Sequence, residues 1–240
     1  MAEHLHDRDL RGVRLERCDL SGAVLRGVEV DGVDLDSPWL AEGRLLVNGV
    51  DVVPLVEAEL DRRFPGRSLR GAATPEGLRE AWTALEAAWD ALVARALTLD
   101  PALLERRVEG EWSFSETLRH LVMATDVWLR GAVLGVPRPY HPIGVPNAEF
   151  ATDGHDTSVF SEPSPALTRV LEVRAGHRAL VAQHLATLGP EELERTCPHP
   201  WAPEHRVTVL HCLHTILGEE WEHLRYAGRD LDVLAASAPG

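Results

Sequence analysis

Residues 208–226 read TVLHCLHTILGEEWEHLRY, a stretch that combines a helical apolar stripe with several metal-binding residue types. The apolar residues recur at the spacing of a helix that packs one face against a core. Glu219 and His223 are four positions apart in the sequence, so they lie one turn apart along the helix and about 40° apart around it. Cys212 and Ile216 share that sector, and we therefore expect Glu219 and His223 to face the protein interior.

A carboxylate and an imidazole on one buried helix face indicate a metal site. Together they can bind one ion, whereas a charge left without a partner on an apolar face would be costly. The third ligand must come from another helix, and His120 is the best choice because Leu121 and Trp128 flank it on the inward side. One carboxylate and two imidazoles suit Zn²⁺, Ni²⁺, Fe²⁺ or Mn²⁺ and leave positions open for water or substrate. We therefore predict a divalent metal bound by His120, Glu219 and His223.

Three other segments show the same helical periodicity. Thr74-Pro75 is a cap followed by proline at the first helical position, and Ser113 with Glu116 forms a capping box. The predicted helices cover residues 75–96, 113–134, 164–188 and 208–226, followed by a short helix over 229–236. Four amphipathic helices of this length pack as a bundle. The sequence therefore predicts a mainly α protein with an antiparallel four-helix bundle at residues 75–240.

Two segments between these helices are candidate walls of a site. Residues 135–163 form a connection of almost thirty residues, and loops of that length are usually functional. We expect this loop to form a lid over one end of the bundle. The segment CPHPWAPEH, residues 197–205, reads as a linker and as a second wall.

The N-terminal segment has a different period. Leucine or valine recurs at intervals of five from Leu5 to Leu35, and a small or apolar residue stands two positions before most of them. A period of five fits neither a helix nor a flat strand, but it fits a coil that turns a corner every five residues. The segment resembles pentapeptide-repeat proteins, which wind as a square β-helix. This β-solenoid-like segment implies a structural role or a docking surface. A coincidental alternation in a β-rich segment is the alternative.

A hairpin and a short helix follow the repeats. Asn48-Gly49 between apolar residues is a strong hairpin signal, and Pro54 opens a short amphipathic helix that Pro65-Gly66 ends. We therefore divide the chain into residues 1–65, a linker over residues 66–74, and the bundle over residues 75–240.

The bundle resembles a known family at the residues that suggest the site. Trp112-Ser113, Glu116, His120-Leu121 and, late in the last long helix, His223 and Arg225 are similar to the DinB-like superfamily, which includes mycothiol-dependent maleylpyruvate isomerases and bacillithiol S-transferases. The spacing of Glu219 and His223 resembles the isomerase branch, where a glutamate and a histidine on one helix join a histidine from the second helix. The resemblance implies a cytoplasmic metalloprotein, often a homodimer, with a low-molecular-weight thiol such as mycothiol as cosubstrate.

These observations favour a metal-dependent enzyme of the thiol-dependent S-transferase or isomerase type that acts on a small molecule. A metal-bound water or thiolate would be the nucleophile, and no residue stands out as a separate general base. Arg225 and Tyr226 follow His223 and could contact an anionic substrate. A non-catalytic metal-binding or protein-interaction scaffold is one alternative, and a metal-dependent hydrolase is another. In the plainest alternative, His120 is a core histidine and Glu219 with His223 is a helix salt bridge.

Several other polar residues have structural explanations that we prefer. Glu116 serves better as a cap than as a fourth ligand, and Cys212 as a core thiol. Arg174, His177 and His184 fit a half-exposed helix edge, and His141 and His155 in the long loop would reach the metal only if the loop folds inward.

Composition narrows the function classes further. The net charge of −14 argues against a nucleic-acid partner, which would need a basic face, and against an anionic membrane surface. The first ten residues lack the apolar core of a secretory signal, and no run reaches the ~18 apolar residues of a membrane span. Three scattered cysteines are no disulfide framework. We therefore expect a cytoplasmic protein that binds a small molecule.

Overall fold

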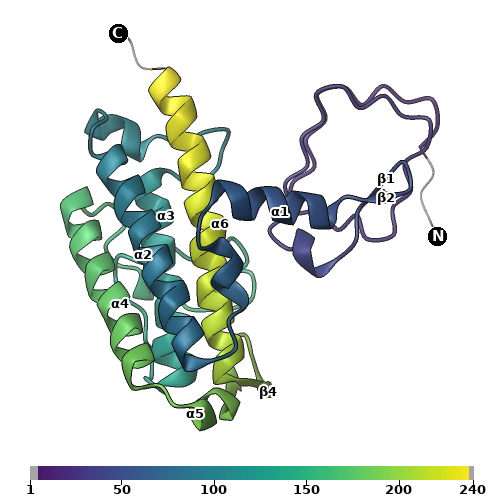
Figure 1. Ribbon diagram of the computed structural model, residues 1–240. Helices are drawn as coiled ribbons and strands as arrows, with labels where there is room; N and C mark the ends of the chain where they lie inside the picture. Colours follow the sequence, from purple (N-terminus) through teal and green to yellow (C-terminus); the bar gives the residue numbers. More distant parts are fainter. Residues whose placement is uncertain (1–4, 238–240) are drawn as a thin grey trace. The chain divides into compact units, whose positions relative to one another are not determined.

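A computed structural model describes residues 5–237 and divides the chain into two compact units, Met1–Ser37 and Pro38–Gly240 (Figure 1). The first unit has no regular helix or strand among its described residues. Its backbone has positive φ at every fifth position, and these residues are Asp7, Gly12, Arg17, Gly22, Gly27 and Gly32. Backbone hydrogen bonds close turns at ten-residue intervals, for example from the Val13 amide to the Leu10 carbonyl. The predicted corner at every fifth residue is confirmed.

The first unit buries none of its described side chains. Leu15 is 63% exposed and Leu25 is 69% exposed, although both lie at the repeating apolar position. A solenoid covers such residues by stacking one coil on the next. About four pentapeptides complete a square coil, so this short segment makes no more than about two coils and leaves its apolar positions accessible to solvent.

The second unit begins with a 3-10 helix, Leu40–Glu42, which a hairpin and a short α-helix follow. Strands β1 (Leu46–Val47) and β2 (Val50–Asp51) pair antiparallel around Asn48 and Gly49, which both have positive φ. Helix α1 (Val53–Arg63) carries proline in its first turn, as the sequence predicts. The expected linker after it holds a 3-10 helix, Arg67–Gly71, in which the buried Arg67 donates hydrogen bonds to Glu57 and Asp61 of α1. Residues 66–74 therefore belong to the same compact unit as the bundle.

Four long helices form the bundle, and the mainly α fold is confirmed. They are α2 (Pro75–Ala96), α3 (Phe114–Thr125), α4 (Leu167–Thr187) and α6 (Val209–Ala236). Their apolar stripes meet in one core that includes Trp82, Trp89 and Trp221. The core therefore contains most of the apolar positions that the helical periodicity identifies.

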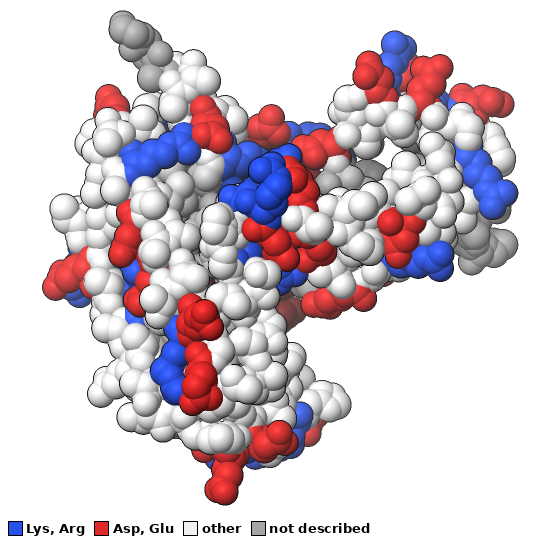
Figure 2. Space-filling model, viewed as in Figure 1, with Lys and Arg blue, Asp and Glu red and all other residues white. Residues whose placement is uncertain are grey.

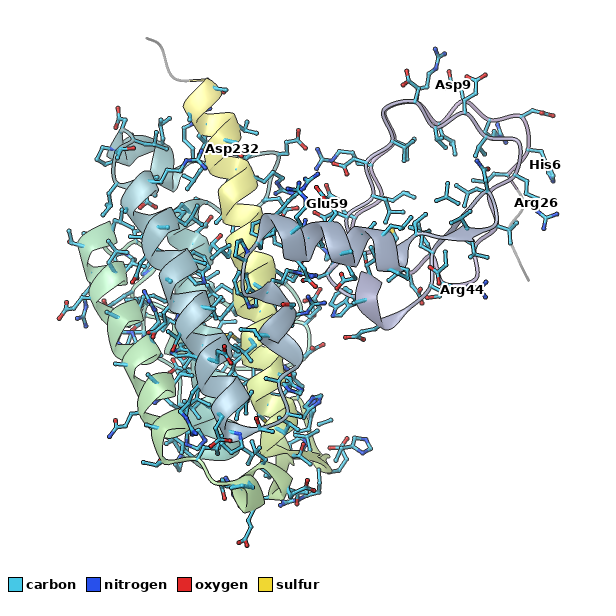
Figure 3. The ribbon with its side chains drawn as sticks, in the orientation of Figure 1. His6, Asp9, Arg26, Arg44, Glu59 and Asp232 are labelled. Carbon is cyan, nitrogen blue, oxygen red and sulfur yellow. The ribbon has the colours of Figure 1, made fainter. Side chains whose placement is uncertain are left out.

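The long loop changes the direction in which the helices run. Arg95, in the last turn of α2, donates a hydrogen bond to Asp232 near the C-terminal end of α6, which Figure 3 labels. Arg79, near the start of α2, instead bonds the Leu185 carbonyl at the end of α4. Helix α2 is thus parallel to α6 and antiparallel to α4. The loop crosses the length of the bundle, so that α3 and α4 run in the same direction, as one long crossover permits.

Two helices differ from their predicted forms. The chain after α3 continues as a π-helical segment, Asp126–Val133, in which the Leu134 amide bonds the Leu129 carbonyl. The predicted break after Tyr226 is wrong, because α6 continues without interruption to Ala236. Gly228 does not end the helix because Ala227 and Leu231 extend its buried face, and a Cβ atom at position 228 would contact Leu92.

The segment before α6 is more ordered than a linker. After a short helix, α5 (Pro190–Glu194), the chain forms an antiparallel hairpin of β3 (Thr196–His199) and β4 (Ala202–Thr208). Cys197 on β3 lies against Cys212 on α6, with their sulfur atoms 3.6 Å apart. Pro198 in β3, Pro200 in the turn and Pro203 in β4 concealed the strand character of the segment, because proline is depleted from strands.

The surface of the second unit carries mixed charge. On the face that Figure 2 shows, acidic and basic side chains are interspersed along the helices. Among the described residues, no helix is long and apolar enough to cross a membrane.

The capping box of α3 makes stability depend on pH. Partial burial raises the pKa of Glu116, but hydrogen bonds from Arg107 and the Ser113 amide outweigh it and hold the pKa below its ordinary value of 4.5. A lowered pKa stabilises the fold above the unfolded value, and this contribution disappears as the pH falls below it. Glu116→Gln should therefore reduce the free energy of unfolding by roughly 0.5–1 kcal/mol near neutral pH. Urea denaturation should show the difference from the parent protein shrinking below about pH 4.5. Glu76→Gln, on the exposed first turn of α2, is the control, and a pH-independent difference would contradict the prediction.

Candidate metal centre

The three predicted ligands meet between the antiparallel helices α3 and α6. His120 projects from α3, and Glu219 and His223 project from successive turns of α6. Glu219 Oε2 lies 3.4 Å from His120 Nε2 and 3.2 Å from His223 Nε2. One ligand atom from each residue lies within 4.8 Å of the other two, and this is the one group of its kind that the described residues contain. The three ligand atoms therefore lie close enough together to be candidate ligands of one ion.

The backbone fixes which nitrogen of His120 faces the site. His120 Nδ1 lies 3.0 Å from the carbonyl oxygen of Val145 in the long loop. A carbonyl only accepts hydrogen bonds, so Nδ1 donates to it, and Nε2 is the nitrogen that faces Glu219. Histidine ligands of metals usually make such a bond with their second nitrogen. The contact therefore holds the His120 ring with Nε2 toward Glu219.

Arg119 binds the long loop that contains the Val145 carbonyl. Its Nε donates to the Ile143 carbonyl at 2.7 Å, and its Nη1 donates to the Pro163 carbonyl at 2.9 Å. The side chain is buried next to His120, and it holds two parts of the loop that are twenty residues apart in sequence. The predicted lid is thus a fixed wall along α3. Sequence reasoning missed Arg119 and Val145, because an arginine and a valine carry no metal-ligand signal.

Aromatic side chains cover the imidazoles. The Trp112 ring lies 4.3 Å from the His120 ring and 5.6 Å from the His223 ring, measured between centroids. Tyr226 lies 6.1 Å from His223, and the Arg225 guanidinium packs 4.3 Å above the Tyr226 ring. Arg225 also donates to Glu222 at 2.9 Å, so its charge is already balanced beside the site.

The electrostatics favour the protonation states that a metal needs. Burial raises the pKa of Glu219, but hydrogen bonds with His120 and His223 outweigh burial and hold that pKa well below its ordinary value. Burial lowers the pKa of His223, although Glu219 opposes the shift. An ionised carboxylate and a neutral imidazole are the forms that bind metal. The Glu219 side chain is 35% exposed, whereas that of His120 is 8% exposed, so solvent reaches the centre from the carboxylate side.

The other polar candidates on the bundle lie outside this group. Glu116 forms the cap and pairs with Arg107. His177 is buried and bonds Asp126 Oδ1 through Nε2 at 2.8 Å, and Arg174 is buried against Glu220. The expectation of a half-exposed edge for these two residues is therefore wrong, because each is buried with an acidic partner.

The remaining candidate residues also lie outside the group formed by His120, Glu219 and His223. Burial and the neighbouring Cys197 raise the pKa of Cys212 to about 12, which keeps its thiol protonated. His184 is half-buried on α4. His141, in the long loop, packs against His177 of α4. His155, in the same loop, packs against Phe150 and Trp201.

Removing either histidine should abolish metal binding. The purified protein should take up one equivalent of Zn²⁺, Ni²⁺ or Mn²⁺. His120→Ala and His223→Ala should each lower the affinity by more than the roughly 10–100-fold that the loss of an outer-shell contact causes. Competition with a chromophoric chelator measures this change. His205→Ala, on the exposed part of β4, should leave binding intact. Equal affinity in all four proteins would place any bound ion elsewhere.

Arg119, which holds the long loop, should affect the affinity for a metal although it is not one of the three predicted ligands. Arg119→Gln removes the donors that hold the loop, so His120 loses its fixed orientation and the affinity for Zn²⁺ should fall roughly tenfold. Circular dichroism should confirm that the helices remain. Arg169→Gln, on the exposed surface of α4, is the matched control. An unchanged affinity in Arg119→Gln would show that the Val145 carbonyl does not position His120.

Models of known families match both the N-terminal segment and the helical bundle. A family model described as pentapeptide repeats matches residues 4–37 in eight copies. A second model, described as DinB superfamily, matches residues 84–227 and so covers more than half of the chain and all three residues of the candidate centre. No curated protein and no solved structure matches. The chain belongs to the DinB superfamily and carries pentapeptide repeats at its N-terminus.

Proposed function

We propose that this protein is a divalent-metal enzyme of the thiol-dependent S-transferase or isomerase type. It would use a low-molecular-weight thiol as cosubstrate and act on a small electrophilic molecule. The observation that carries the proposal is the convergence of His120 Nε2, His223 Nε2 and Glu219 Oε2 at a place that solvent reaches. Three protein ligands with open positions are typical of catalytic rather than structural sites. Metal binding is also frequent in the DinB superfamily.

The side chains present fit such an ion. Two imidazoles and one carboxylate suit Zn²⁺, Ni²⁺, Fe²⁺ or Mn²⁺. When bound, the ion would act as a Lewis acid that lowers the pKa of a coordinated thiol or water. His120, Glu219 and His223 would hold it, and the Val145 carbonyl would keep His120 in the required tautomer.

Residues beside the centre would orient the organic substrate. Trp112 forms an apolar wall over both imidazoles, and Tyr226 lies beyond His223. In the transfer step, the thiol would lose its proton to water and its sulfur would form a bond to an electrophilic carbon, while the bond from that carbon to the leaving group breaks and the leaving group departs with the bonding electrons. Arg225 contributes little attraction for an anion because Glu222 neutralises it. The arrangement therefore favours a substrate bound by apolar contact over one bound by charge.

A non-catalytic scaffold is the second candidate, and the exposed leucines and valines of residues 5–37 favour it. In that case the repeats would form a docking surface and the metal would stabilise the bundle. For the protein as a whole we propose a cytoplasmic location, a small-molecule ligand and a homodimer, without a nucleic-acid or membrane partner. The acidic net charge of −14 supports the last two points.

Turnover with defined thiols tests the proposal. The metal-loaded protein is incubated with mycothiol, bacillithiol, glutathione or cysteine, and with an electrophile such as monochlorobimane or maleylpyruvate. Thiol-dependent product formation should appear, and it should disappear in His120→Ala and after chelation. The His205→Ala protein should match the parent.

Two results would overturn the assignment as a thiol-dependent S-transferase or isomerase. Hydrolysis of an activated ester without any thiol would indicate a metal-dependent hydrolase. A metal-loaded protein that turns over none of these substrates would support the scaffold.

A further inference from the structure

A cavity lies in the bundle away from the candidate metal centre. It occupies about 320 Å³ between α2 and α4, which lie side by side in Figure 1. None of its lining residues belongs to the candidate metal centre. Most of its walls are apolar, and they are formed by Trp89, Val93, Ala94, Leu97, Leu118, Leu171 and Ala175. A volume of this size falls within the range of small-molecule sites.

One lining residue is a buried cation with unused donors. Arg174 is 4% exposed, and its Nη2 bonds both carboxylate oxygens of the buried Glu220. Its guanidinium lies 5.9 Å from the centre of the Trp89 ring. Arg174 Nε and Nη1 are buried and have no hydrogen-bond partner among the described residues. Buried donors are usually paired in folded proteins, so an unpaired arginine beside a cavity indicates a place for an acceptor.

The charges around the cavity exclude an anion as the preferred ligand. Glu220 already neutralises Arg174. The second arginine in the lining, Arg178, pairs with Asp90 at 2.7 Å and with Glu86 at 3.5 Å. Two arginines thus face three carboxylates, so the surroundings carry no positive charge for a carboxylate or phosphate. Arg174 has hydrogen-bond donors left to offer but no excess charge.

We propose that this cavity binds a small, uncharged, apolar molecule that carries one acceptor oxygen, such as an aryl or alkyl ketone. The apolar part of the ligand would occupy the space between α2 and α4. Its oxygen would accept a hydrogen bond from Arg174 Nε or Nη1. The volume corresponds to on the order of ten non-hydrogen atoms, at about 30 Å³ for each water-sized group. The proposal does not depend on the metal or on the proposed activity.

Three ligands of similar size test separately the apolar part of the ligand, its acceptor oxygen and its lack of charge. Acetophenone has the apolar ring and the acceptor, ethylbenzene lacks the acceptor, and benzoate replaces it with a charge. Each is titrated into the ¹⁵N-labelled full chain, and NMR follows the indole N–H of Trp89 and the Nε–H of Arg174. Acetophenone should shift both signals saturably. Ethylbenzene should bind roughly tenfold more weakly because it makes no hydrogen bond, and benzoate should bind more weakly than acetophenone.

Substitutions on α2 and at Arg174 of α4 complete the test. Ala94→Phe fills the cavity from an exposed position and should abolish the shifts, whereas Ala87→Phe, exposed on α2 outside the lining, should not. Arg174→Lys keeps a cation opposite Glu220 but lacks Nε and Nη1, so acetophenone should weaken roughly tenfold, to the level of ethylbenzene. The proposal is overturned if acetophenone causes no saturable shift, if benzoate binds more tightly, or if Ala94→Phe binds like Ala87→Phe.

Discussion

The carboxylate of Glu219 lies between the imidazoles of His120 and His223 where α3 and α6 pack together, and the surrounding structure is arranged around this contact. Ionisable groups are expensive to remove from water unless they are paired. Here the antiparallel packing of α3 and α6 brings the pairing groups together, and Trp112 covers the two imidazoles. An ion at this place would satisfy all three groups at once, which neither imidazole can do alone.

The long crossover loop links the fold to the candidate centre. Because it returns along the bundle, it passes His120 and presents the Val145 carbonyl to it. Arg119 holds the loop from α3. At its other end, buried Asp126 of the π-helical segment accepts hydrogen bonds from the His141 amide in the loop and from His177 on α4. The extra residue of a π-turn re-aims neighbouring side chains, and such turns are frequent at functional sites. The loop is thus fixed at several points along the bundle.

Much of the bundle could be predicted from local signals. The Thr74-Pro75 cap and the Ser113 capping box mark the starts of α2 and α3, because these side chains satisfy free backbone amides. The pairing of Glu219 with His223 followed from helical spacing, and His120 was identified from its place on a buried face. The five-residue period likewise set the positive φ values of residues 5–37.

Other features depend on tertiary contacts and were not predictable. The uninterrupted α6 depends on packing beyond Tyr226, and the π-helical segment has no local sequence signal. The burial of His177 and Arg174 depends on Asp126 and Glu220, which are more than forty residues away in sequence. The Arg119 side chain donates to loop carbonyls and Val145 contributes its own carbonyl, so the roles of both residues appear only when the loop is placed. The β3–β4 hairpin was obscured by its prolines.

A crystal structure of the protein soaked with Zn²⁺, with anomalous data collected at the zinc edge, tests the central claim most directly. The account predicts one anomalous peak about 2.0–2.2 Å from His120 Nε2, His223 Nε2 and a Glu219 oxygen, with no fourth protein ligand. It also predicts that Val145 remains bonded to His120 Nδ1. A peak at other residues, or a fourth side chain that closes the coordination sphere, would contradict the account.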